Sequence, residues 1–192
     1  MASRLYRLWP PLLLVVLAGL VAAACETPAG PALASPAAGS MAGTPLAMPG
    51  VVTYVADGDT LTIRRSDDTT TRIRLLGIDA PEIAHDGRPA DCGGDEAAAS
   101  LKTLLPPGIF VQAVTDPVSD TWDVYGRLLA YVSAPGIPDV GLAQIQGGYA
   151  EAWIPAGQTP PARYISYQQT ETTAQQQSAG AWASCATLGR QP

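Results

Sequence analysis

The chain has 192 residues, with 17 Asp or Glu against 11 Lys or Arg, and its formal net charge is −6. This length allows one folded domain plus extensions. A surface that binds polyanions is normally basic, so the acidic balance counts against a nucleic-acid-binding function.

Residues 1–24 have the pattern of an export signal. Arg4 and Arg7 precede the apolar run LLLVVLAGLV, and small residues precede Cys25. The run is short for a membrane-spanning helix and two prolines lie before it, although an uncleaved anchor helix stays open as the alternative. Without this segment nine basic and seventeen acidic side chains remain, and the net charge is −8.

Cys25 follows the small residues directly, at a place that resembles the lipobox of bacterial lipoproteins, in which this cysteine carries the lipid. Ala22 stands where a leucine is usual, so cleavage and release is the alternative. The residues that follow are almost wholly Pro, Ala, Gly, Ser and Thr, and they bury too little apolar surface to offset their ordering entropy. We expect a disordered tether over 25–50, a folded domain over 51–187 and a tail over 188–192.

The domain is predicted to begin with three strands joined by tight turns, one of them around Gly58. β-Branched residues and a period of two indicate the strands, and acids in a first turn with Pro and Gly beyond the end indicate a helix. The predicted elements are strands at 51–56, 60–65 and 70–78, a helix at 95–105, strands at 109–115 and 127–133, and helices at 138–148 and 162–178. Five strands with helices after the third and the fifth indicate an OB-fold, a five-stranded Greek-key barrel with about three helices.

A non-periodic loop separates the third strand from the first helix, and it contains Cys92. This cysteine and Cys185 form an even pair, which in an exported chain suggests one disulfide. Two buried thiols are the alternative. With the pair bridged, the only histidine, His85, has too few partners for a four-ligand zinc site.

Acidic side chains gather in two short stretches, DGDT at 57–60 and IDAPE at 78–82, with RIRLLG between them. Taken alone, DGDT is an ordinary hairpin turn, and Arg72 and Arg74 are an ordinary solvated strand face. Together they combine carboxylates, which hold a hard divalent cation, with guanidinium groups, which bind phosphate.

The runs VADGDTLTI, RIRLLGIDAPE and DVYGRLLAYV, followed by GAW before Cys185, resemble the thermonuclease family, the staphylococcal-nuclease-like domains. The resemblance covers most of residues 51–185. It implies an OB-fold nuclease that cleaves DNA and RNA phosphodiesters with a calcium ion. By residue, it implies the carboxylates of Asp59 and Asp79 and the carbonyl of Ala80 as calcium ligands, and Arg74, Glu82 and Arg127 as catalytic side chains.

These residue types suit that chemistry. Pro81 biases Ala80 toward an extended backbone, which favours a carbonyl turned toward an ion. Glu82 is the candidate general base for an attacking water, and an arginine fork donates two hydrogen bonds to a phosphoryl group. One departure weakens the match, because Val124 stands where a lysine often precedes the tyrosine of the YGR motif.

We therefore expect a monomeric, exported nuclease that depends on calcium, is held to the membrane by a lipid anchor or secreted, and favours single-stranded DNA or RNA. One rival is a non-catalytic nucleic-acid-binding module on the same fold, which the acidic surface favours. Another is a calcium-stabilised surface protein that binds a protein partner.

Overall fold

The structure is a computed structural model that describes residues 44–188. The predicted export signal, Cys25 and most of the predicted tether lie outside the described residues. The elements are β1 (Ala47–Val55), β2 (Thr60–Arg64), β3 (Thr70–Leu75), β4 (Ile78–Asp79), α1 (Gly94–Leu104), β5 (Phe110–Val114), β6 (Leu128–Ser133), α2 (Val140–Gln146), β7 (Glu151–Ala152), α3 (Tyr164–Gln176) and a 3₁₀ helix (Gly180–Ala183).

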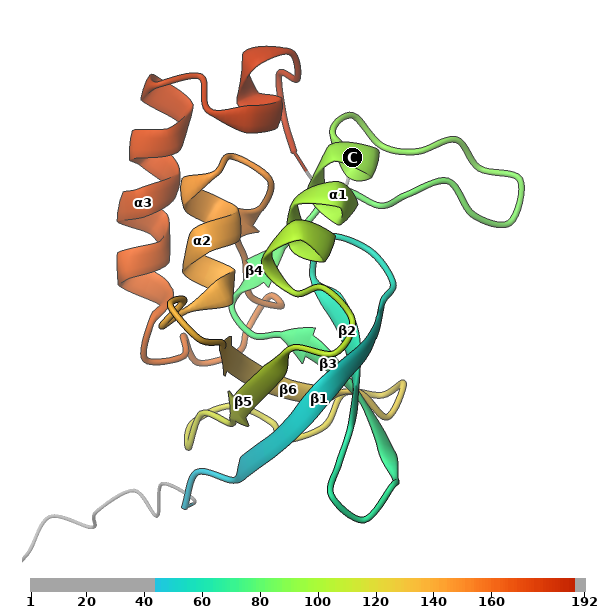
Figure 1. Ribbon diagram of the computed structural model, residues 1–192. Coiled ribbons are helices and arrows are strands. Elements are labelled where there is room, and N and C mark those ends of the chain that lie inside the picture. Colours follow the sequence, from blue (N-terminus) through green and yellow to red (C-terminus); the bar gives the residue numbers. More distant parts are fainter. Residues whose placement is uncertain (1–43, 189–192) are drawn as a thin grey trace, which may run out of the picture. The chain divides into compact units, whose positions relative to one another are not determined.

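Five strands close into a barrel in the order β1-β2-β3-β6-β5, with β5 returning to pair with β1. The β3–β6 pair is parallel and the other four pairs are antiparallel. The three helices gather at one end of the barrel (Figure 1). The predicted fold class, a five-stranded barrel with three helices, is confirmed.

The barrel strands place alternate side chains inside, as their period of two predicts. On β2, Leu61 and Ile63 are fully buried; on β3, Ile73 and Leu75 are buried in the same way. Burying an aliphatic side chain of this size contributes about 1.5–3 kcal/mol, so this interior supplies much of the domain's stability. The alternation also fixes which β2 and β3 residues face outward.

The prediction of one strand over 70–78 is wrong at its end. Gly77 has φ 82°, a left-handed conformation that strongly favours glycine, and it turns the chain after β3. The next two residues form β4, which pairs with β7 outside the barrel, Asp79 lying opposite Glu151. The turn carries Asp79 back over the end of the barrel.

The first strand also begins four residues before residue 51, the predicted start of the domain. β1 begins at Ala47, which pairs with Val114 of β5, and Met48 is buried in the barrel. Residues 47–50 therefore belong to the barrel and not to the tether. Their proline-rich composition concealed the strand, although Pro49 suits an outward position on it.

Polar contacts fix α2 and α3 against each other. Asp139 caps α2 by accepting from the Leu142 amide at 3.0 Å. The same carboxylate accepts from the Tyr167 hydroxyl at 2.9 Å and pairs with Arg163 at 2.7 Å, both from the start of α3. Among residues 44–188, no helix has the length and apolar character needed to cross a membrane.

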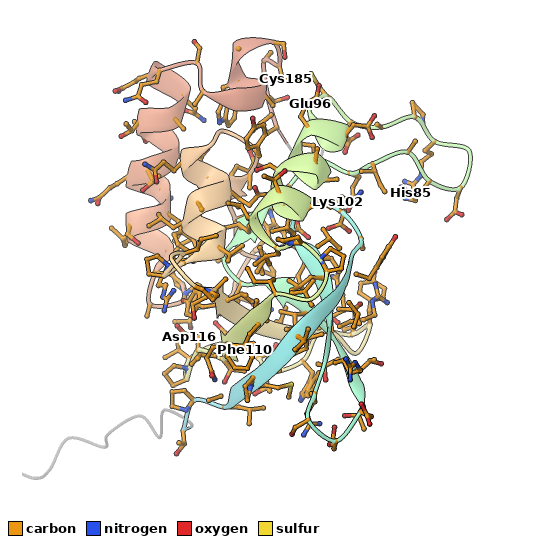
Figure 2. The ribbon with its side chains drawn as sticks, viewed as in Figure 1. His85, Glu96, Lys102, Phe110, Asp116 and Cys185 are labelled. Carbon is orange, nitrogen blue, oxygen red and sulfur yellow. A yellow bond between two sulfur atoms is a disulfide. The ribbon has the colours of Figure 1, made fainter. Side chains whose placement is uncertain are left out.

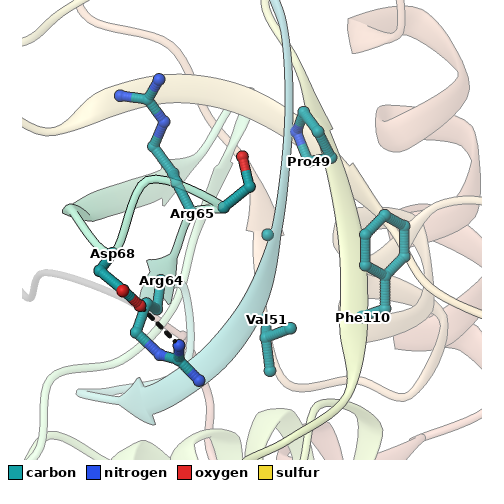
Figure 3. Close-up of a pocket in the computed structure, with 8 residues that line it drawn as sticks. Pro49, Val51, Arg64, Arg65, Asp68 and Phe110 are labelled. Carbon is teal, nitrogen blue, oxygen red and sulfur yellow. Dashed lines mark hydrogen bonds and ion pairs between the residues drawn. The ribbon is translucent and has the colours of Figure 1, made fainter.

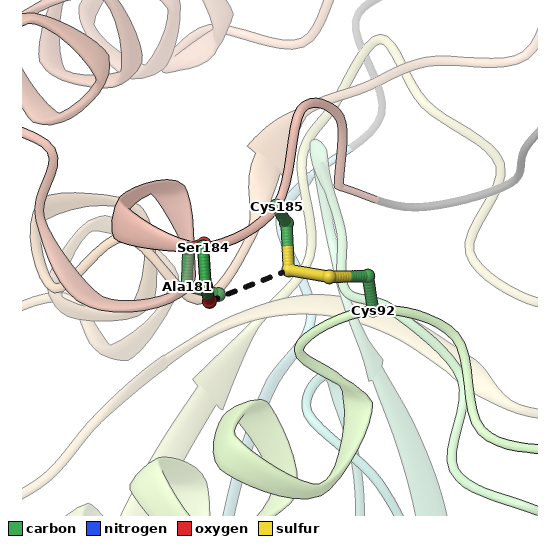
Figure 4. Close-up of a disulfide and its surroundings, with 4 residues drawn as sticks. All are labelled: Cys92, Ala181, Ser184 and Cys185. Carbon is green, nitrogen blue, oxygen red and sulfur yellow. Dashed lines mark hydrogen bonds between the residues drawn. A yellow bond between two sulfur atoms is a disulfide. The ribbon is translucent and has the colours of Figure 1, made fainter.

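The predicted disulfide is confirmed. Cys92, just before α1, is bonded to Cys185, just after the 3₁₀ helix, with their Cα atoms 5.8 Å apart (Figure 4). Beside it, Ala181, Cys185 and Leu188 form a small apolar cluster separate from the barrel core. The bridge thus joins the loop after β4 to the end of the domain.

Candidate active site

The DGDT turn is pressed against the strand that follows β3. The Asp57 carboxylate accepts from the Asp59 amide at 3.0 Å, and the buried Gln144 amide of α2 donates to the Gly58 carbonyl at 2.7 Å. A Cβ at Gly58 would lie 2.6 Å from the Cβ of Ala80. Only glycine lets the turn approach so closely, and this approach brings Asp59 to the backbone of Ala80.

Asp59 and Asp79 meet at one guanidinium group. Arg74 forms an ion pair through Nε with Asp59 at 3.0 Å and donates through Nη2 to Asp79 at 2.6 Å. It also donates to the Ile78 carbonyl at 2.7 Å. The three side chains are at most 13% exposed, so the two carboxylates share a dry site with one cation between them.

The Asp59 carboxylate is the most buried acid of the site. One oxygen accepts from the Thr60 hydroxyl at 3.0 Å and the other from the Ala80 amide at 2.9 Å. Burial raises the pKa of Asp59 to about 7, although Arg74 lowers it; the charges of Asp57 and Asp79 raise it further. Burial and the neighbouring acids therefore outweigh Arg74 in setting the pKa of Asp59.

Glu82 lies two residues beyond Ala80 and is half-buried. Asp91 holds its backbone on both sides: its carboxylate accepts from the Glu82 amide at 3.3 Å, and its amide donates to the Glu82 carbonyl at 2.9 Å. Within residues 44–188, the Glu82 carboxylate accepts no hydrogen bond. Burial raises its pKa, and the charges of Asp57 and Asp79 raise it further.

Arg127 approaches from the start of β6. Asp123 fixes it by accepting from its Nε at 2.6 Å and from its backbone amide at 2.8 Å. Its Nη1 also donates to the Thr60 hydroxyl at 3.4 Å, and that hydroxyl in turn donates to Asp59. A hydrogen-bonded chain therefore links Arg127 to the acids around Arg74.

All six predicted site residues lie in one region. Asp59, Asp79, Ala80 and Arg74 are joined by ion pairs and hydrogen bonds, Arg127 is joined to them through Thr60, and Glu82 faces the charges of Asp57 and Asp79. His85, by contrast, is exposed on the long loop away from the barrel, where its ring contacts the Ile83 carbonyl and Arg88 (Figure 2).

Three neighbours of the site were not predicted. Thr60 links the arginines, Asp123 orients Arg127, and Glu151 lies opposite Asp79 in the β4–β7 pair. The spacing of four residues between Asp123 and Arg127 was the one signal in the sequence. The pKa of Glu151 is raised to about 7, mainly by burial and then by the charges of Glu171 and Asp79.

Residues 72–184 match the family described as "Staphylococcal nuclease homologue". The chain belongs to this family. It is 33% identical over 139 residues to "Endonuclease YhcR" of Bacillus subtilis, covering 69% of this chain and 11% of that protein. It is 33% identical over 122 residues to "Probable endonuclease LCL3" of Arthroderma otae, covering 60% of this chain and 42% of that protein.

A third match, "Probable endonuclease LCL3" of Ajellomyces dermatitidis, is 37% identical over 89 residues, covering 43% of this chain and 28% of that protein. The chain thus spans less than half the length of each of these three relatives. The first match covers more of this chain than the family segment, and it includes about two thirds of all residues.

The donor set of this family member suits a hard cation. The charges of Asp57 and Asp79 raise the pKa values of Asp59 and Glu82, Asp59 and Asp79 share Arg74, and all the ligands that these four side chains offer are oxygens. In the part of the chain described, no three His, Cys, Asp or Glu residues form a ready-made metal cluster. A calcium ion would therefore need the carbonyl of Ala80 and water beside the two aspartates.

Proposed function

We propose that this chain is a calcium-dependent nuclease that hydrolyses phosphodiester bonds of DNA or RNA. The observation that supports it most is the meeting of Asp59 and Asp79 at Arg74, with Arg127 linked to them through Thr60. Two arginines and two buried carboxylates in one site offer binding places for both a cation and a phosphate group.

Each side chain has a role in this proposal. Asp59, Asp79 and the carbonyl of Ala80 would hold calcium, which supplies Lewis-acid polarisation of the phosphate and orients it. Arg74 and Arg127 would bind the phosphoryl oxygens, most strongly as charge builds in the transition state. Calcium would compete with Arg74 for the carboxylate oxygens of Asp59 and Asp79. Calcium binding would therefore free Arg74 to bind the phosphate.

Glu82 would accept the proton of the attacking water. Its carboxylate is half-buried and accepts no hydrogen bond from residues 44–188, and its backbone is held by Asp91. A carboxylate whose backbone is fixed and whose oxygens are free to accept a proton suits a general base. The negative charges of Asp57 and Asp79 favour the protonated form of Glu82 once it has accepted the proton.

We propose further that the protein works outside the cytoplasm. The disulfide of Cys92 with Cys185 supports this, because such bonds persist in oxidising compartments. The pattern of residues 1–24 supports export, and lipidation of Cys25 would attach the domain to a membrane. Intact-mass analysis of the protein from a native membrane fraction tests the lipid, which adds a diacylglycerol mass at Cys25.

Cleavage of a fluorescent single-stranded DNA tests the function. The wild type is expected to cut with calcium and to stop when a chelator is added. Glu82→Gln keeps the shape of the side chain but removes its basicity, and we expect it to lose about 100-fold or more in rate. Glu96→Gln, an exposed acid on α1, makes the same charge change elsewhere and should cut normally.

The other outcomes separate the rivals. Binding of the DNA without cleavage at any calcium concentration supports the non-catalytic module. Cleavage that is equally fast with Glu82→Gln removes the assigned base. Neither binding nor cleavage removes the nucleic-acid function altogether.

A further inference from the structure

The basic side chains of the described domain are concentrated on one hairpin. Residues 44–188 contain eight Lys or Arg, and four of them lie on β2, β3 and the turn between them: Arg64, Arg65, Arg72 and Arg74. The same hairpin carries two acids, Asp67 and Asp68, which pair with Arg65 and Arg64, so it is net positive in a chain whose net charge is −6. A polyanion approaching the domain would meet its positive charge there.

The strand register arranges these residues in rows on the outer face of the barrel. Directly opposed residues of antiparallel strands share a face, and the inward positions are taken by the aliphatic core. The rows, from the candidate active site outward, are Thr60 with Arg74, then Tyr54 with Thr62 and Arg72, then Phe110 with Val51, Arg64 and Thr70. Neighbouring rows are two residues apart along β2 and β3, about 7 Å, and on β1 a bulge between Val52 and Tyr54 makes the step from Tyr54 to Val51 three residues.

The second row offers an aromatic ring and a free cation. Tyr54 is 60% exposed on β1. Arg72 is exposed on β3 and forms no ion pair within residues 44–188. Tyr54 and Arg72 lie on opposite sides of β2, each paired with Thr62, so the ring would stack a base while the guanidinium group two strands away would pair with a phosphate, independent of sequence.

The third row ends in a hollow of about 250 Å³ lined by Pro49, Val51, Arg64, Arg65, Asp68 and Phe110 (Figure 3). The ring of Phe110 is 54% exposed, on the other side of β1 from Arg64. Arg64 pairs with Asp68 at 2.9 Å, but these side chains are 52% and 84% exposed. An ion pair so open to water contributes about 0–1 kcal/mol, so a phosphate can replace Asp68.

From these rows we propose that the outer face of β1, β2 and β3 is a track for a single nucleic-acid strand leaving the candidate active site. Arg72 and Arg64 pair with successive phosphates, while Tyr54 and Phe110 stack bases. The five residues of β3 from Arg74 to Thr70 span about 14 Å, enough for two or three nucleotides beyond the cleaved bond. This inference rests on the proposed function, since that function supplies the strand.

The track explains how an acidic domain binds a polyanion. Its contacts are few and lie in a line, so they favour an extended single strand over a duplex, whose paired bases are not available to stack. The same arrangement predicts that affinity rises with strand length up to the length of the track and then levels off.

Binding of fluorescent oligothymidylates tests the track without needing cleavage. Fluorescence anisotropy is measured in chelator with a 12-mer and a trinucleotide, for the full chain and for Arg64→Gln/Arg72→Gln. We expect the double variant to lose about tenfold in affinity for the 12-mer and less for the trinucleotide, with a salt slope shallower by about 1.4. Tyr54→Ala should lose fivefold or more for the 12-mer.

The matched control is Arg88→Gln/Lys102→Gln, which removes two exposed charges from the long loop and from α1. If the control loses as much affinity as the hairpin variant, net charge and not the track governs binding, and the inference is overturned. Equal affinity of all variants for the 12-mer overturns it too. Cleavage by the wild type is measured separately, so failure of the proposed function is seen as absent cleavage and failure of the track as unchanged binding.

Discussion

Removing the disulfide should lower the stability of the domain by a large and calculable amount. The bond joins Cys92 to Cys185, 93 residues apart, and so excludes many conformations of the unfolded chain. The chain-entropy relation gives about 4.6 kcal/mol for such a loop, and measured bridges of this kind commonly give about 2–4 kcal/mol. For a domain of this size the loss corresponds to a fall of roughly 5–15 °C in Tm.

Thermal unfolding followed by circular dichroism measures this effect. The oxidised wild type is compared with the reduced wild type and with Cys92→Ser/Cys185→Ser. We expect the last two to unfold at the same lower temperature, and the serine variant to be insensitive to reductant. A reduced wild type that unfolds within a degree of the oxidised form would refute the reasoning, because the bridge would then constrain nothing that the fold does not already constrain.

The disulfide should also affect the site, because Cys92 follows Asp91, which holds the backbone of Glu82. Gly94 lies so close to Glu82 that a Cβ there would be 2.2 Å from its carbonyl oxygen. Reduction is therefore expected to lower kcat more than it raises KM. The measurement is made well below the Tm of the reduced protein, so that unfolding does not account for the loss.

The remaining predictions concern single residues. Arg127→Lys keeps the charge but loses the fork, and we expect kcat for DNA to fall about 100-fold; near-normal turnover would remove Arg127 from catalysis. Gly58→Ala drives a methyl group against Ala80, and urea unfolding should show a loss of about 1–3 kcal/mol. The pKa of Glu151 is raised to about 7 from an ordinary 4.5, so its ionisation costs stability as pH rises through this window. Glu151→Gln should therefore raise Tm at pH 8 more than at pH 4, and an equal change at both pH values would contradict the assigned burial.

Much of the fold was predictable because its signals are local. The alternation predicted β2 to within a residue and the start of β3, and the turn chemistry around Gly58 predicted the hairpin. An even pair of cysteines predicted the disulfide, although only the structure shows the bond. That prediction needed only the number of cysteines and the expected export of the chain.

The parts that were missed depend on contacts between distant residues. The two-residue pair of β4 with β7 is too short to leave a pattern, and it decides where Asp79 lies. The convergence of Asp59 and Asp79 does not come from a pairing of the first and third strands, because β2 lies between them. The turn at Gly77 and the buried Gln144, 86 residues from Gly58, bring the site together instead.

The candidate site was predictable as a set of residues but not as an arrangement. Motif order selected Asp59, Asp79 and Arg74, whereas the link from Arg127 through Thr60 spans 67 residues and follows only from the parallel pairing of β3 with β6. Sequence spacing carries no information about such a link.

Calorimetric titration of the full chain with calcium, in the presence of a short nucleotide, tests the central claim most directly. The account predicts one ion per chain, with binding at least tenfold weaker in Asp79→Asn and unchanged in Glu96→Gln. Calcium binding of wild-type strength in Asp79→Asn would contradict it, because the two aspartates would then not share an ion.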